Sequence, residues 1–219
     1  MPTKAPTPAD LKGRAARIRK VLNARYPEVA PALFYRNPFE LLVATILSAQ
    51  CTDQQVNRVT PGLFARFGSP GAFAAAGLEE IEELIHSTGF FKNKARNIKA
   101  CSQALVERHG AEVPADMDAL VRLPGVGRKT ANVVLGAAFG IPGIVVDTHV
   151  ARIAGRLGLT AHTDPEKIET DLMAVIPRTE WSAFSLRLIF FGREICAARK
   201  PKCPTCPVND LCPYPDKTI

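Results

Sequence analysis

The sequence predicts an all-α fold. Apolar residues recur three and four positions apart through most of the chain, which is the spacing that places side chains on one face of an α-helix. No segment shows the alternation of apolar and polar residues that marks a half-buried strand. Glycine and proline separate the periodic segments, so we expect short helices joined by tight turns. The expected helices span residues 9–25, 39–50, 78–86, 94–108, 116–122, 128–139, 148–158, 165–176 and 180–192.

Prolines and acidic residues mark the expected helix ends. Proline has a fixed φ and no amide hydrogen, so it is tolerated best near the start of a helix or beyond its end. Pro61 is one of the prolines expected at such a place. Asp53, Asp116 and Asp147 each precede a helix start, where a carboxylate can accept hydrogen bonds from the amides of the first turn. We therefore predict these three residues as N-caps.

The composition is that of a folded globular protein. The chain has 219 residues, of which 47% are hydrophobic and 22% are charged, and this length suits one or two domains. The longest apolar run, residues 131–146, contains asparagine, glycine and proline, and it is shorter than the ~18–20 uninterrupted residues of a membrane span. The first residues lack the apolar core of a secretory signal. We therefore expect no transmembrane helix and a cytoplasmic protein.

Positive charge is concentrated in three places. The formal net charge is +7, from 28 Lys and Arg against 21 Asp and Glu. Residues 1–25 contain seven basic residues and one acidic residue, which gives a local charge of +6 (7 minus 1). The other two clusters are Lys92, Lys94, Arg96 and Lys99, and Arg122, Arg128 and Lys129. Such clusters are typical of proteins that bind a polyanion. Solvated helix faces show the same pattern, so charge alone leaves both interpretations open.

Four of the six cysteines lie close together near the C-terminus. They are Cys196, Cys203, Cys206 and Cys212, with the spacing C-x6-C-x2-C-x5-C. In a chain without an export signal, thiols stay reduced, so metal ligation is favoured over disulfide bonds. Zinc and a cubane iron–sulfur cluster both accept four thiolates, and the spacing alone does not separate them. Cys51 and Cys101 stand alone, and we expect both to be small buried side chains.

A second candidate is the segment 123–130, which reads Leu-Pro-Gly-Val-Gly-Arg-Lys-Thr. Two glycines so close to a proline predict a tight hairpin that leads into a helix. The first amides of that helix have no intrahelical partner, so they can bind a phosphate with help from the helix dipole. The same pattern also fits a plain connection between two packed helices. The spacing of a nucleotide-binding P-loop is absent.

The third candidate is the pair Lys129 and Asp147. They lie 18 residues apart, across one expected helix and a return loop, so an amine and a carboxylate could face one groove. An amine nucleophile must be unprotonated, and the neighbouring Arg128 and the helix N-terminus both disfavour the charged ammonium. As pure structure, Asp147 needs to be no more than an N-cap. His149 is expected to be a packed or capping side chain rather than a base.

These three candidates together resemble the endonuclease III family of DNA repair glycosylases, within the helix-hairpin-helix glycosylase superfamily. The resemblance covers nearly the whole chain and extends to Leu47–Asp53 and to the basic turn Gly89–Ala95. It implies a two-lobe helical fold. The implied first lobe is 23–140, with the helix-hairpin-helix motif at about 117–136; the second is 1–22 plus 141–219, with a cluster loop at 196–212.

The resemblance also implies an activity. The chain is expected to be a bifunctional DNA glycosylase and abasic-site lyase that removes oxidised pyrimidines from duplex DNA and cleaves the strand 3′ to the abasic site by β-elimination. Lys129 would form the Schiff base, and Asp147 would stabilise the developing positive sugar or assist proton transfer. A [4Fe–4S] cluster would be bound by Cys196, Cys203, Cys206 and Cys212, which shifts the metal assignment from zinc to iron. Adenine-specific relatives typically lack a lysine at the position of Lys129.

The implied DNA contacts are of three kinds: residues that fill the gap left by an extruded base, the hairpin, and a basic loop shaped by the cluster. They are Gln50, Phe90, Lys92, Gly125, Val126, Gly127, Arg128, Thr130, Arg199, Lys200 and Lys202. The sequence departs from the family at the intercalating apolar residue, which is commonly leucine and here is Phe90 or Phe91. The sequence does not decide between the two phenylalanines.

Two other classes of function fit parts of the sequence. One is a helix-hairpin-helix DNA-binding module without chemistry, in which Lys129 only contacts phosphate. The other is an iron–sulfur or zinc protein in which the cysteine tail serves redox chemistry or a subunit contact. Covalent trapping on DNA with an abasic site separates these classes from a lyase. We expect a monomer whose partner is double-stranded DNA with damaged bases or abasic sites, and no membrane partner.

Overall fold

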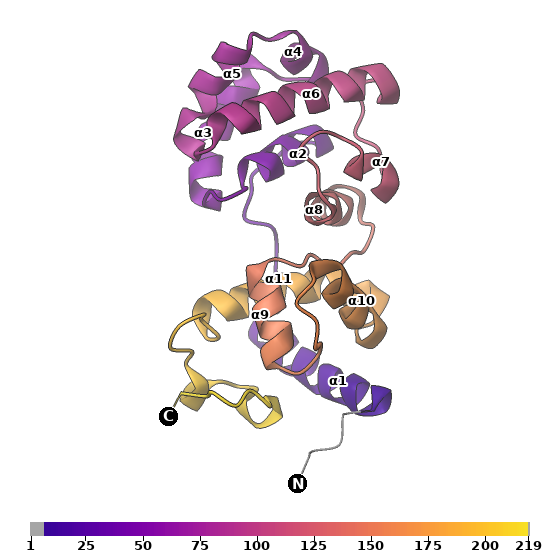
Figure 1. Cartoon of the computed structure of the whole chain (residues 1–219), viewed down its shortest axis with the longest axis vertical. Coiled ribbons are helices and arrows are strands. Elements are labelled where there is room, and N and C mark those ends of the chain that lie inside the picture. The colour runs from indigo at the N-terminus through magenta and orange to yellow at the C-terminus, as the bar shows by residue number, and fades with distance from the viewer. Residues whose placement is uncertain (1–6, 219) are drawn as a thin grey trace. The chain divides into compact units, whose positions relative to one another are not determined.

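The protein consists of two compact helical units. The computed structural model describes residues 7–218, and all regular secondary structure among them is helical, which confirms the all-α prediction. Unit 1 comprises Met1–Ala30 with Pro142–Ile219, and unit 2 is Pro31–Ile141 (Figure 1). The first lobe boundary expected from the sequence, between residues 22 and 23, falls inside a helix that runs to Arg25 and buries Ile18 and Leu22 in the core of unit 1. Lys4, part of the N-terminal basic cluster, lies outside the described residues.

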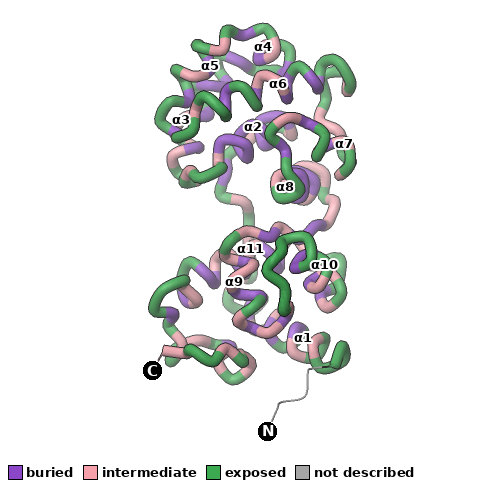
Figure 2. Tube along the Cα trace, viewed as in Figure 1, coloured by how far each residue is buried: buried purple, intermediate pink, exposed green. Residues whose placement is uncertain are grey.

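Unit 2 is built around one nearly fully buried helix. Its helices are α2 (Pro38–Leu47), α3 (Asp53–Arg66), α4 (Pro70–Ala75), α5 (Leu78–Ile85), the short 3-10 helix η1 (His86–Thr88), α6 (Phe91–His109), α7 (Met117–Val121) and α8 (Arg128–Phe139). Every residue of α2 from Phe39 to Leu47 is buried, as Figure 2 shows. A helix that is buried on every face requires neighbours on all sides. Helices α3, α6 and α8 supply them, while α4 and α5 pack on α6.

Unit 1 joins the beginning of the chain to its end. Its helices are α1 (Pro8–Arg25), α9 (Thr148–Arg156), α10 (Pro165–Val175) and α11 (Trp181–Glu194), with 3-10 turns η2 (Arg178–Glu180), η3 (Cys203–Thr205) and η4 (Asn209–Leu211). The core is formed where α9 and α11 pack together and α1 contacts α10 and α11. Beyond α11 the chain has only short 3-10 turns, and this segment carries the four clustered cysteines.

The structure corrects three details of the predicted helices. Pro61 lies inside α3, not at a helix end. The α3 residues Val56, Thr60 and Leu63 are buried at helical spacing, so packing stabilises a helix there despite the proline. The N-cap of α3 is Thr52, whose hydroxyl accepts from the Gln55 amide at 3.2 Å, and Asp53 is the first helical residue. The helix ranges expected from the sequence also leave out both α3 and α4.

The other two predicted caps are confirmed. A carboxylate oxygen of Asp116 accepts from the Ala119 amide at 2.8 Å, and that of Asp147 accepts from the Val150 amide at 2.8 Å. Both aspartates have extended backbones, as N-caps require. Among residues 7–218, none of the helices has the length and apolar character needed to cross a membrane.

Candidate functional site

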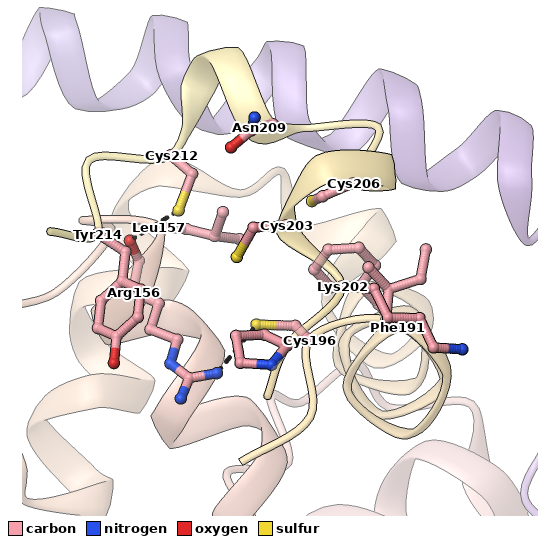
Figure 3. Close-up of a pocket in the computed structure, with 12 residues that line it drawn as sticks. Arg156, Leu157, Phe191, Cys196, Lys202, Cys203, Cys206, Asn209, Cys212 and Tyr214 are labelled. Atoms are coloured by element: carbon pink, nitrogen blue, oxygen red, sulfur yellow. Dashed lines mark hydrogen bonds between the residues drawn. The ribbon is translucent and has the colours of Figure 1, made fainter. Parts of the chain in front are cut away.

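The four clustered cysteines line one pocket of unit 1 (Figure 3). Cys196 follows α11, Cys203 begins η3, Cys206 follows it, and Cys212 follows η4. The sulfur atoms of Cys196, Cys203 and Cys212 point into the space that Figure 3 shows between them. The other residues that line the pocket are Arg156, Leu157, Phe191, Ile195, Pro201, Lys202, Asn209 and Tyr214. The pocket therefore offers four thiols within a largely apolar wall.

This donor set fits a cluster better than a single ion. In the described part of the chain, no three His, Cys, Asp or Glu side chains lie close enough together to ligate one metal ion. A cubane cluster binds one thiolate at each of four irons, so it accepts a wider arrangement of sulfurs. Burial raises the pKa of the Cys206 thiol, and the other three cysteines raise it further. Cationic iron would favour the deprotonated thiolates that ligation needs.

Two arginines of α9 hold the loop that enters the cluster pocket. The Arg152 Nη2 donates to the carbonyl of Cys196 at 2.9 Å. The Arg156 guanidinium donates to the carbonyls of Ala197 at 2.7 Å and Ala198 at 3.0 Å, and Nη1 lies 3.4 Å from the Cys196 sulfur. The same helix is capped at its start by Asp147. Helix α9 therefore links the proposed catalytic carboxylate to the cluster loop within one rigid element.

The cluster loop, residues 197–202, presents basic side chains to solvent. Arg199, Lys200 and Lys202 are all exposed. Lys200 has a φ of 50°, in the left-handed region that is costly for a residue with a Cβ. The loop is closed by a hydrogen bond of 2.9 Å from the Lys202 amide to the Ile195 carbonyl. These residues are consistent with the phosphate contacts expected from the sequence.

The hairpin of unit 2 is fixed by its glycine and its valine. Gly125 has a φ of 76°, and a Cβ built at this residue would lie 2.7 Å from the Cβ of Asn97. Conformation and space therefore both demand glycine there. Val126 is buried, and its amide donates to the Leu123 carbonyl at 3.1 Å. Gly127 is the N-cap of α8, and a Cβ at this residue would meet open space.

Lys129 stands in the first turn of α8, directly behind the hairpin. Its side chain is exposed, as is that of Arg128, while Thr130 is half-buried. The first amides of a helix lack intrahelical partners and attract anions, so this helix start suits a phosphate. Lys129 belongs to unit 2, whereas Asp147 belongs to unit 1. The structure thus shows an accessible amine and a capping carboxylate on separate units.

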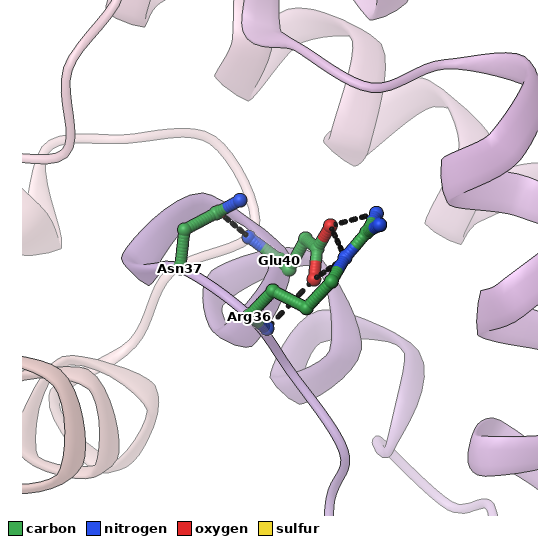
Figure 4. A network of polar contacts seen from close by, with 3 residues as sticks. All are labelled: Arg36, Asn37 and Glu40. Carbon is green, nitrogen blue, oxygen red and sulfur yellow. Dashed lines mark hydrogen bonds and ion pairs between the residues drawn. The ribbon is translucent and has the colours of Figure 1, made fainter.

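Gln50 follows the buried helix α2. The start of α2 is anchored by Arg36, whose guanidinium and backbone amide both bond to the buried Glu40 carboxylate, while the Asn37 side chain caps the helix (Figure 4). At the other end of α2, residues 48–51 form a turn closed by a 3.1 Å bond from the Cys51 amide to the Ser48 carbonyl. Gln50 in this turn is exposed and has a φ of 51°.

The two phenylalanines at 90 and 91 have different environments. Phe90 is 63% exposed and has a φ of 49°. Phe91 is half-buried, packs on the core of unit 2 and contacts the His86 ring at a centroid distance of 4.4 Å. Of the two side chains, Phe90 is therefore the one presented to solvent, a difference that the sequence does not reveal.

The remaining residues singled out in the sequence differ in how far they are buried. Lys92 is exposed, but Lys94 of the same basic cluster is buried, so the cluster presents less positive charge than its sequence indicates. Cys101 is buried, and burial raises its pKa to about 12. Cys51 is half-buried against the core. His149 is half-buried, with its Nδ1 3.2 Å from Arg152, in agreement with a packed side chain.

Sequence reasoning missed the residues that support the cluster loop. Arg152 and Arg156 are four residues apart on α9, which places them on the same face of the helix. That spacing is visible in the sequence, but the carbonyls they bind lie more than 40 residues away. Tyr214 was also missed; its ring lies under the Arg156 guanidinium at 4.6 Å.

Known proteins resemble this chain over nearly its full length. Residues 43–178 match the family model described as HhH-GPD superfamily base excision DNA repair protein, and residues 196–212 match the iron-sulfur binding domain of endonuclease III. Endonuclease III from Synechocystis sp. is 55% identical over 206 residues, which cover 94% of this chain and 94% of that protein.

Two solved structures extend the similarity to DNA complexes. One, a trapped endonuclease III–DNA covalent intermediate, has a TM-score of 0.86 at 48% identity; the match covers 91% of this chain and 95% of that chain. The other, a non-covalent endonuclease III–DNA complex, has a TM-score of 0.88 at 47% identity and covers 92% and 95%. The match at 196–212 also supports the predicted [4Fe–4S] cofactor over zinc.

Proposed function

Because the chain belongs to the endonuclease III family of base excision DNA repair proteins, we propose that it is a bifunctional DNA glycosylase and abasic-site lyase. Its substrate is duplex DNA that carries an oxidised pyrimidine or an abasic site. The observation that carries this proposal is the exposed Lys129 in the first turn of α8, behind a hairpin whose Gly125 admits no side chain. One solved structure, 48% identical to this chain, is a trapped covalent intermediate of endonuclease III with DNA, and Lys129 is the residue that we assign to such a bond here.

The reaction begins with attack of the neutral Lys129 amine on C1′ of the damaged nucleotide. The new N–C1′ bond forms as the glycosidic bond breaks, and the base departs with the bonding electrons and takes up a proton. Asp147 stabilises the positive charge that develops on the sugar. The C1′–O4′ bond then breaks with its electrons moving to O4′. The lysine nitrogen gives up its two protons, one to the departing base and one to O4′, so the opened sugar carries an imine between the lysine nitrogen and C1′.

The imine makes strand cleavage possible because it accepts electrons. Loss of the C2′ proton sends its electron pair toward the imine, and the C3′–O bond breaks with its electrons leaving on the 3′ phosphate. Water then hydrolyses the imine, which returns the Lys129 amine and releases the unsaturated sugar aldehyde. Atoms and electrons balance without an external oxidant or reductant. The strand is therefore cut 3′ to the lesion by β-elimination.

Binding is divided between backbone contacts and gap filling. We assign phosphate contacts to the hairpin and helix start and to two exposed basic regions; the residues are Gly125, Val126, Gly127, Arg128, Thr130, Lys92, Arg199, Lys200 and Lys202. An enzyme that extrudes a nucleotide must fill the gap left in the stack. We assign that role to Gln50 and Phe90, both exposed on turns with positive φ.

The cofactor has a structural role in this proposal. We assign Cys196, Cys203, Cys206 and Cys212 as the ligands of the [4Fe–4S] cluster. When bound, the cluster supplies four iron–thiolate bonds that fix the end of the chain, and the reaction steps need no electron from it. Its effect on DNA passes through the loop 197–202, which carries the exposed basic side chains.

The proposal is tested by borohydride trapping on a duplex with one abasic site. Wild-type protein is expected to form a covalent adduct, Lys129→Ala to form none while still binding DNA, and Asp147→Asn to slow base release more than it weakens affinity. Lys167→Ala is a matched control, because Lys167 is also exposed in the first turn of a helix, α10. Undiminished trapping by Lys129→Ala would assign the nucleophile to another amine. Binding without any adduct from wild-type protein would instead support a DNA-binding module.

We further propose that the enzyme works as a monomer in the cytoplasm, where reduced thiols are available for the cluster. Gel filtration at micromolar concentration tests the monomer.

A panel of duplexes, each with one defined oxidised base, tests the substrate class. Faster removal of an oxidised purine than of any oxidised pyrimidine would contradict the assignment to pyrimidines.

A further inference from the structure

Lys94 is a buried lysine for which the proposed reaction has no use. Only 4% of its surface is exposed, and its Nζ donates to the Thr88 carbonyl at 2.8 Å. Burial of an ammonium is costly unless hydrogen bonds compensate it, and burial lowers the pKa of Lys94 here. A lysine in this place cannot serve as a free phosphate contact. Its bond to the Thr88 carbonyl is therefore the feature to explain.

That bond supports a turn with an unfavourable backbone. Thr88 precedes Gly89, whose φ of 70° and ψ of 153° suit only glycine, and Phe90, whose φ of 49° and ψ of 27° are left-handed. A left-handed conformation costs a residue with a Cβ about 1–2 kcal/mol. The turn needs external support to persist, because Phe90 is largely exposed and gains little from packing.

Lys94 contacts the turn on both sides of these residues. Its ammonium binds the carbonyl of Thr88, and its own backbone amide donates to the carbonyl of Phe90 at 3.1 Å. Thr88 is itself held in place, because it is 1% exposed and its hydroxyl donates to the Ile85 carbonyl at 2.8 Å. The Lys94 side chain thus holds the beginning of the strained pair, while the backbone bond from residue 94, which any residue there would make, holds its end.

The segment before the Phe90 turn is also joined to α3, the helix that follows the Gln50 turn. A hydrogen bond of 2.8 Å runs from the Gln55 side chain, in the first turn of α3, to the Ser87 hydroxyl in η1. Both segments belong to unit 2, so this contact lies within one compact body.

We infer that Lys94 is a positioning residue for base extrusion: by holding the Thr88 carbonyl, its ammonium fixes the turn that presents Phe90. The inference rests on the proposed function, because it takes Phe90 as a side chain that fills the gap. Lys94 itself would not contact DNA, because its side chain is buried. Its loss should affect only the step that needs a wedge.

The test compares two steps on the same duplex with Lys94→Met. Removal of a paired oxidised pyrimidine requires extrusion, whereas cleavage at an existing abasic site requires far less. Loss of a buried charge-assisted hydrogen bond predicts a drop of about tenfold in base removal. Cleavage at the abasic site should change by less than about twofold. Equal losses in both steps would overturn the inference.

A matched control and a double variant separate positioning from general destabilisation. Lys99 also lies on α6 and also donates to a backbone carbonyl, that of Ala76, but it does not touch the turn. Lys99→Met should leave the ratio of the two steps unchanged. If Lys94 acts through the wedge, the double variant Lys94→Met with Phe90→Ala should lose no more base removal than Phe90→Ala alone. Additive losses would contradict the inference.

A measurement on the wild-type protein covers the case in which Lys94→Met does not fold. Hydrogen exchange should show the amides of residues 86–94 protected at least about tenfold relative to a free peptide. Exchange at the free-peptide rate would overturn the inference without any variant. If wild-type protein neither removed bases nor formed an adduct, the proposed function would fail, while this exchange measurement would still decide whether the turn is fixed.

Discussion

The hairpin of unit 2 and the cluster loop of unit 1 both present positive charge, but they are held in different ways. The hairpin depends on neighbours in sequence: Gly125 adopts a φ of 76°, and the buried Val126 donates to Leu123 three residues earlier. The cluster loop depends on distant groups. Arg152 and Arg156 bind its carbonyls from α9, more than 40 residues away in the chain.

This difference predicts how the structure of each surface responds to a substitution or to loss of the cofactor. A turn encoded mainly by its own residues keeps its shape as long as those residues are intact and its neighbours, α8 and Asn97, stay in place. A loop tied by remote arginines and by a cofactor loses its shape when either is removed. Perturbations of one surface should therefore leave the other almost unchanged, and this independence can be tested.

The largest effect is expected from loss of the cluster. Cys203→Ser removes one thiolate ligand, so we expect the protein to lose its iron, as measured by elemental analysis. We also expect the free energy of unfolding to fall by more than about 3 kcal/mol, as measured by thermal unfolding. Hydrogen exchange should rise at residues 196–212 and stay constant at 123–130. Cys101→Ala, which removes a buried thiol from unit 2, should retain all its iron. Equal exchange changes in both segments would show that the two surfaces are coupled.

The next effect concerns the hairpin. Gly125→Ala should destabilise the protein by about 2–3 kcal/mol, since a left-handed alanine is strained and its Cβ would lie 2.7 Å from Asn97. DNA affinity should fall, and iron content should not change. Gly127→Ala is the control, because its φ is −94° and a Cβ there meets nothing within 4 Å. Similar destabilisation by both alanines would contradict the role assigned to Gly125.

The same contrast explains what the sequence could predict. The hairpin, the caps Asp116 and Asp147 and the helix periodicity are local, so residue types and spacing revealed them. The cysteine spacing indicated a metal site, yet not the arginines that shape its loop, because those contacts arise only in the folded chain. Lys94 was placed in a basic surface cluster for the same reason: nothing local distinguishes a buried lysine from an exposed one. Phe90 and Phe91 became distinct only when one was seen to pack on His86.

A moderate effect is expected from the α9 arginines. Arg156→Met removes the donors to the Ala197 and Ala198 carbonyls and the contact with the Tyr214 ring. We expect the free energy of unfolding to fall by about 1–3 kcal/mol. We also expect weaker DNA binding, because the cluster loop would lose the hydrogen bonds that hold it in place. Arg156→Lys keeps the charge but not the planar two-pronged donor, so it should recover only part of the loss. Full recovery by lysine would mean that charge alone supports the loop.

The smallest effect separates charge from conformation at Lys200. The residue is exposed, has a φ of 50°, and is assigned to a phosphate contact. Lys200→Ala removes the charge but keeps the strain, whereas Lys200→Gly removes both. Each should lower the salt slope of DNA binding by about 0.9, the value for one phosphate. Glycine should also be more stable than alanine by about 1 kcal/mol, because it adopts a left-handed backbone without strain. If alanine and glycine were equally stable, the cluster loop would not store strain at Lys200, and its shape would follow from the remote contacts alone.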